Sequence, residues 1–195
     1  MTRFRTIATA ITLCLLPICA HASSFVYNLD VVLSGGTVTG TITTDSDSGV
    51  LAASDILDYN LVLNDGSHTL NLLGALSGNN SEVLIGGSAV TASAAGLSYD
   101  FAANPAFFAI QALPLGSSTD FFCLNDPVAS CNTGGASNVA ARIGSDPTFS
   151  GPPIDGVGVF ATVAVPPAVP EPSTITLLGT GALGLIGVVR RRLIR

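Results

Sequence analysis

The feature that most constrains this chain is an uncharged apolar run close to its C-terminus, which is followed by Arg190, Arg191 and Arg192. As a helix, residues 173–189 would extend about 26 Å, slightly less than the ~30 Å hydrocarbon core of a bilayer. Arginine side chains reach to the membrane interface and compensate for such a difference. We therefore expect one short transmembrane helix, with the basic residues 190–195 in the cytoplasm and the preceding chain outside.

The N-terminal segment has the features of a secretory signal peptide. It begins with two arginines, continues as an apolar stretch, and ends in Ala20 and Ala22, the small residues that flank a signal-peptidase site. We expect removal of residues 1–22, with cleavage between Ala22 and Ser23. This interpretation implies the Sec machinery and signal peptidase as partners, whereas an uncleaved anchor helix is the alternative.

Between these two ends, residues 23–165 carry almost no positive charge. Arg142 is their one basic residue against twelve acidic residues, a formal charge of −11. Nucleic acids and anionic lipid surfaces are bound through cationic contacts, so we expect neither as a partner. The chain contains no lysine, which excludes a P-loop.

Residues 23–165 show the pattern of an all-β domain. Short segments rich in β-branched and aromatic residues alternate with turn residues, and no stretch has a sustained helical period. We expect strands at 25–33, 37–44, 56–63, 68–73, 82–85, 88–92, 97–101, 107–113, 121–124, 139–143 and 157–165. About ten strands at this spacing indicate an antiparallel β-sandwich or jelly roll.

Two local features complete the expected organisation. Asn64-Asp65-Gly66 is a strong hairpin signal, with His68 starting the returning strand on an exposed face. After the last strand, the proline-rich residues 166–172 predict an extended, semi-rigid stalk.

Two cysteines lie in the expected exported domain. Cys123 and Cys131 form an even pair in an oxidising compartment, separated by a loop with turn-forming residues. We expect a disulfide between them, which would contribute about 2–3 kcal/mol. Two buried free thiols are the alternative.

One turn has the composition of a calcium loop. Asp45 and Asp47 alternate with serine and precede Gly49, and oxygen-rich turns of this kind bind Ca²⁺. The sixth and twelfth positions of an EF-hand-like loop would be Val50 and Ile56 rather than glycine and glutamate. Asp45 and Asp47 are therefore a weak calcium candidate, and a solvated acidic turn is the better interpretation; no other metal site is expected.

The sequence predicts neither enzymatic activity nor a cofactor. His68 is the one histidine left after signal cleavage, which excludes a site with two or three imidazoles, and no Gly-x-Ser-x-Gly elbow is present. A glycosidase needs only two carboxylates, but Glu82 is the only glutamate of the domain and the aspartates lie mainly at turns. Because two carboxylates suffice in principle, a polysaccharide-acting hydrolase remains an alternative to the non-catalytic interpretation.

Carbohydrate binding is a further alternative. The adjacent pairs Phe107-Phe108 and Phe121-Phe122 must point one ring to each side of a strand. One ring of each pair is then available for an exposed aromatic platform, although the domain has no tryptophan.

The C-terminal residues resemble the PEP-CTERM sorting signal of exported bacterial proteins. Pro170, Glu171 and Pro172 come first, then the apolar segment, then the arginine cluster. The resemblance implies that an exosortase, an integral membrane transpeptidase-like enzyme, reads these three residues while the helix holds the protein in the inner membrane. An ordinary tail anchor behind a proline stalk is the alternative.

The resemblance also implies a destination. Such proteins are released to or beyond the outer surface of Gram-negative bacteria that make extracellular polysaccharide, so exopolysaccharide is a candidate partner. Residues 40–45 and 54–59 are loosely similar to the β-rich region of other exported proteins with this tail, for which the resemblance implies no known activity. We therefore expect a non-catalytic protein at the cell surface or in the extracellular matrix.

Overall fold

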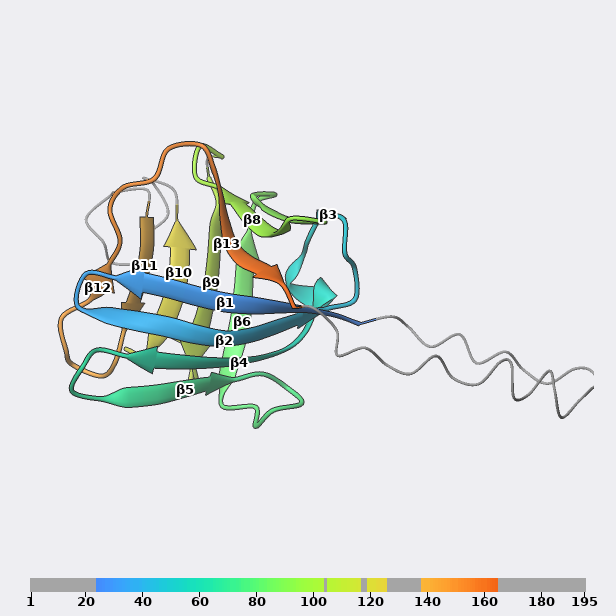
Figure 1. The fold of residues 1–195 in the computed structure, drawn as a ribbon. Coiled ribbons are helices and arrows are strands. Elements are labelled where there is room, and N and C mark those ends of the chain that lie inside the picture. The colour runs from blue at the N-terminus through green and yellow to red at the C-terminus, as the bar shows by residue number, and fades with distance from the viewer. Residues whose placement is uncertain (1–23, 104, 117–118, 126–137, 165–195) are drawn as a thin grey trace, which may run out of the picture. The chain divides into compact units, whose positions relative to one another are not determined.

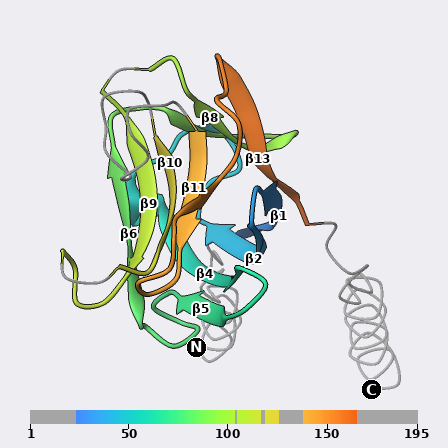
Figure 2. The same ribbon diagram turned by 90° about the vertical axis from the view of Figure 1, so that its left-hand side faces the viewer.

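The computed structural model describes residues 24–103, 105–116, 119–125 and 138–164, which form an all-β domain. Its two antiparallel sheets enclose a hydrophobic core, and the strands of the second sheet run across those of the first (Figures 1 and 2). The first sheet has the order β3 (Gly49–Val50), β7 (Val90–Ser93), β8 (Gly96–Asp100), β13 (Val157–Val163), β1 (Phe25–Leu33), β2 (Gly36–Thr44), β4 (Ile56–Asn64) and β5 (Thr69–Leu73). The second sheet has the order β12 (Phe149–Ser150), β11 (Asn138–Arg142), β10 (Phe121–Asn125), β9 (Phe107–Ala112) and β6 (Ser81–Gly86). The predicted all-β, antiparallel two-sheet fold is confirmed.

The first sheet forms because its strands alternate apolar and polar residues. On β1, Tyr27 and Leu29 point into the core, whereas Asn28 lies on the opposite face. On β2, Ile42 points inward while four threonines at alternate positions point outward. This period of two lets one face of the sheet pack on the core and the other meet solvent.

Gly40 shows how closely two of these strands approach. It lies opposite Leu61 of β4 and has a φ of +142°, and an added Cβ would meet the backbone carbonyl of Asn60. Only glycine adopts this conformation without strain and leaves room for the neighbouring backbone. The residue therefore fixes how β4, which leads into the 64–68 turn, packs beside β2.

The second sheet is more completely buried at its centre. Phe122 and Leu124 of β10 are fully buried, and so is Ala141 of the neighbouring β11. Cys123 points to the other face of β10 and is also buried, at 2% exposure. Strands of this kind read as continuous apolar runs rather than as alternating patterns.

The sequence located most strands to within one or two residues, and the exceptions are informative. β5 begins at Thr69, so His68 lies in the turn and does not start the strand. β12 and β3 lie where the sequence pattern predicted no strand. β3 and β12 have only two residues each, too few for an alternating pattern to be visible. The same holds for η1 (Ala53–Asp55), a single turn of 3-10 helix before β4.

Several predicted segments lie outside the described residues. They are the signal peptide 1–22, the stalk 166–172, the transmembrane helix 173–189 and the basic tail 190–195. Within the described part of the chain, no helix has the length and apolar character that a membrane crossing requires.

Candidate functional site

The turn between β4 and β5 is built by side-chain caps. The backbone N–H of Gly66 donates to Asn64 Oδ1 at 2.7 Å, and the backbone N–H groups of Ser67 and His68 donate to Asp65 Oδ1 at 2.8 and 2.6 Å. Gly66 supplies a φ of +88°, which side-chain-bearing residues adopt rarely. Because Oδ1 of Asp65 is held by the backbone, the orientation of its second oxygen, Oδ2, is fixed as well.

The loop between β11 and β12 supplies a residue from the other sheet. Its first turn is held by a hydrogen bond from the backbone N–H of Gly144 to Asp120 Oδ1 and by one from Arg142 Nε to the Gly144 carbonyl, at 3.1 Å. The backbone N–H of Asp146 then donates to the Ile143 carbonyl at 3.1 Å. These contacts fix the loop that carries Asp146.

Packing brings the two segments to the same end of the domain. The ring of Phe149 on β12 is 4% exposed and lies against Gly36, where an added Cβ would meet its ring carbons. The backbone N–H of Ser34 donates to the Ser150 carbonyl at 3.1 Å. The β1–β2 turn therefore holds β12, and with it the Asp146 loop, beside the turn that carries His68.

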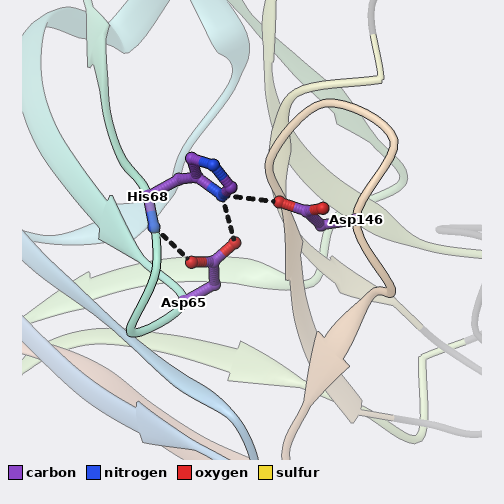
Figure 3. Close-up of side chains that lie close together, drawn as sticks. All are labelled: Asp65, His68 and Asp146. Atoms are coloured by element: carbon purple, nitrogen blue, oxygen red, sulfur yellow. Dashed lines mark hydrogen bonds and ion pairs between the residues drawn. The ribbon is translucent and has the colours of Figure 1, made fainter.

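The result is a cluster of Asp65, His68 and Asp146 (Figure 3). His68 Nδ1 lies 2.9 Å from Asp146 Oδ2 and 3.7 Å from Asp65 Oδ2. The side chains are 62%, 11% and 38% exposed for His68, Asp65 and Asp146, so the imidazole is open to solvent while Asp65 is nearly covered. In Figure 3 both carboxylates point toward the imidazole: that of Asp65 from the turn that also carries His68, and that of Asp146 from the facing loop.

The electrostatics of the cluster favour ionised carboxylates. The backbone N–H of His68, and then that of Ser67, lower the pKa of the Asp65 carboxyl below its ordinary value, with partial opposition from burial. The side chain of Asp146 and the charge of His68 lower the pKa of Asp65 further. Asp65 is therefore a carboxylate across the physiological pH range.

A cavity of about 350 Å³ adjoins the cluster. Besides the three clustered side chains, it is lined by Ser34, Ser67, Thr148 and Phe149 among others. Its walls thus come from the β1–β2 turn, the β4–β5 turn and the β11–β12 loop. Chemically, such a cluster can hold a cation, and an imidazole oriented by a carboxylate can also take up a proton.

The weak calcium candidate is arranged differently. Asp45 and Asp47 are both exposed, and no third His, Cys, Asp or Glu joins them in a ligand cluster within the described residues. Their downstream neighbour Asp55 uses its carboxylate on the backbone N–H of Ala52, at 2.7 Å. The turn is held instead by Thr44 and Ser46, whose hydroxyls donate to backbone carbonyls.

The aromatic pairs do not form an obvious platform. Phe108 and Phe122 are fully buried, and Phe107 and Phe121 are half-buried. The ring of Phe107 lies over Gly86 on the neighbouring strand, where it fills the place of a missing side chain. The ring of Phe107 therefore covers the sheet rather than projecting from it.

The remaining sequence-predicted residues lie outside the described part of the chain. They are Pro170, Glu171 and Pro172 of the sorting motif, Ala20, Ala22 and Ser23 of the cleavage site, Arg190, Arg191 and Arg192, and Cys131. The Cys123–Cys131 disulfide therefore stays a prediction.

Sequence reasoning missed the cluster. The one available signal was that Asp65 and His68 are three residues apart in a turn. Asp146 lies 78 positions further along the chain in a loop that packing alone brings near.

The fold and the C-terminal motif together define the class: a two-sheet β protein that carries a sorting motif. Residues 168–192 match the family model of the PEP-CTERM protein-sorting motif. The protein therefore carries a PEP-CTERM motif, which implies export, a membrane-anchored intermediate and processing by an exosortase. No curated protein and no solved structure matches the chain.

Proposed function

We propose that this protein is a non-catalytic component of the cell surface or extracellular matrix, delivered there by exosortase processing. The observation that carries the proposal is the PEP-CTERM motif at residues 168–192, which directly follows the β domain. A sorting motif of this kind determines where the protein is delivered, whereas the β domain determines what the protein does there.

The charge and the faces of the domain support this proposal. With Arg142 as its one cation, the domain suits a crowded extracellular setting in which like charge keeps proteins apart. Its outer face on β2 carries Thr37, Thr39, Thr41 and Thr43 in alternation. Such hydroxyl-bearing surfaces are compatible with hydrated polymers, and exopolysaccharide is the partner that we propose.

The sorting step is tested by replacing Pro170, Glu171 and Pro172 with alanine in the producing bacterium. We expect the variant to keep the mass of the anchored form and to remain in the inner membrane, whereas the wild type is processed and leaves it. A substitution of Pro166 and Pro167 is the matched control, because it changes the stalk without touching the motif. Unchanged mass and location of the triple variant would contradict the proposal.

A second candidate function is hydrolysis of an extracellular polymer. The specific observation in its favour is the contact of 2.9 Å between His68 and Asp146 beside a cavity that Ser34 and Ser67 help to line. An imidazole in this arrangement can act as a general base. Incubation of the protein with a panel of polysaccharides and esters, with His68→Ala as control, separates the two functions: turnover that this substitution abolishes would favour the hydrolase.

A further inference from the structure

We propose that Asp65, His68 and Asp146 bind one divalent first-row transition ion, with Zn²⁺ as the preferred probe. The two carboxylate oxygens and one imidazole nitrogen all lie within 4.8 Å of one another. The site joins a turn of the first sheet to a loop of the second. It is independent of the sorting motif and does not rest on the proposed function.

The distances fit a metal coordination shell. Ligand atoms about 2.0–2.1 Å from a tetrahedral Zn²⁺ are separated from one another by roughly 3.4 Å. The separations of His68 Nδ1 from the two carboxylates, 2.9 and 3.7 Å, bracket this value. All three ligand atoms lie within 4.8 Å of one another, close enough to surround one ion.

The charges call for a cation at this position. Two carboxylates face the same point, and like charges at such a distance repel each other unless a positive charge lies between them. Arg142, the one cationic side chain of residues 23–165 apart from a protonated histidine, is hydrogen-bonded to the carbonyl of Gly144. A divalent ion held between the two carboxylates would relieve this repulsion, and His68 Nδ1 lies within reach of the same point.

The ligands are held in place before binding. Asp65 Oδ1 accepts two backbone N–H groups, which leaves Oδ2 to face His68. The loop of Asp146 is anchored by Asp120, which accepts the backbone N–H of Gly144. Such supporting hydrogen bonds orient the ligands of metal sites and raise their affinity.

The donor set selects the kind of ion. Imidazole nitrogen with carboxylate oxygens suits Zn²⁺ and its neighbours in the first transition row, whereas Ca²⁺ takes six to eight oxygen ligands. Three protein ligands would leave at least one position for water or an external ligand, and all three of these residues line the neighbouring cavity. A bound ion would link the two sheets and stabilise the folded state, since it binds that state alone.

The test is a titration of the full chain in mild detergent, purified without a histidine tag and stripped with EDTA. We expect binding of one equivalent of ZnCl₂ by isothermal calorimetry, a rise in melting temperature, and much weaker binding of CaCl₂. His68→Ala and Asp146→Asn should each weaken Zn²⁺ binding by about tenfold or more. Asp155→Asn, which removes the same charge from an exposed position away from the cluster, should leave binding unchanged.

Two results would overturn the proposal. One is absence of Zn²⁺ binding up to millimolar concentration. The other is equal affinity in the wild type, His68→Ala and Asp146→Asn, which would assign the binding to other residues. Should a variant not fold, the wild type still decides: Zn²⁺ must shift the NMR signals of the His68 imidazole, assigned by comparison with His21→Ala, and unshifted signals contradict the site.

Discussion

Two turns of this domain carry aspartate, glycine and serine, and they differ in what their side chains meet. The turn at residues 45–49 has two aspartates alternating with serine, and its carboxylates lie exposed without a third ligand-type side chain in the described residues. The turn at residues 64–68 has one aspartate and one histidine, and a loop from the other sheet adds Asp146 at 2.9 Å from the imidazole. The second turn, which has the less suggestive motif, is the one where ligands converge.

The difference shows that a ligand cluster depends on long-range packing more than on local composition. The 45–49 turn is closed by its own neighbours, with Thr44 and Ser46 bonding to backbone carbonyls two residues away. The 64–68 turn is also closed locally, but Phe149 and the Ser34–Ser150 bridge place a second acidic loop beside it.

Phe149→Ala should have the largest effect. Removing a buried phenylalanine costs about 3–5 kcal/mol of folding free energy, and here it also releases the Asp146 loop from Gly36. Phe160→Ala is the matched control, because Phe160 is 7% exposed and packs against Phe108 in the core away from the cluster. Chemical denaturation should show similar losses for both variants.

Zn²⁺ titration of the same two proteins then sharpens the comparison. Under conditions where both are folded, only Phe149→Ala should lose Zn²⁺ affinity. Equal Zn²⁺ affinity in the two variants would mean that the cluster does not depend on the packing of β12.

Asp120→Ala should lower stability moderately, through the β11–β12 loop that carries Asp146. The carboxylate accepts the backbone N–H of Gly144, and loss of a hydrogen bond to a charged group costs about 1.5–3 kcal/mol. Asp45→Ala, at an exposed position, is the matched control and should change the denaturation midpoint little. A stability loss of the same size in Asp45→Ala would show that the carboxylates of the 45–49 turn also stabilise the fold.

The sequence allowed a good prediction of the strands because their apolar residues alternate over five to nine positions, as in Phe25–Leu33. It also identified the hairpin at Asn64-Asp65-Gly66, since the caps there involve neighbouring residues. It did not identify the role of His68, because the partner Asp146 reaches it only through β12, a strand of two residues. Contacts between distant segments leave no periodic trace in the chain.

A smaller, pH-dependent effect should report on the first turn. Burial raises the pKa of Tyr27 above its ordinary value of 10.0, a hydrogen bond with Thr44 opposes this, and the charge of Asp47 adds to it. The unfolded chain therefore ionises first, so this contribution to stability is complete below pH 10 and is lost as the pH rises above it. Tyr27→Phe should show a shallower alkaline loss in denaturation midpoints than the wild type.

The same tyrosine distinguishes the two turns. Asp47→Asn should lower the pKa of Tyr27 in a spectroscopic titration, whereas Asp65→Asn should not, because Asp65 does not contribute to the shift. A bound Ca²⁺ at Asp45 and Asp47 would also lower this pKa, so a titration unaffected by CaCl₂ is expected. A shift on addition of Ca²⁺ would restore the calcium interpretation of the first turn.

The most direct measurement is anomalous diffraction at the zinc edge from crystals of the protein grown with Zn²⁺. We expect one strong anomalous peak within coordination distance of Asp65, His68 and Asp146, and none at Asp45 and Asp47. A peak at the 45–49 turn with none at the His68 cluster, or no peak at either turn, would contradict this expectation.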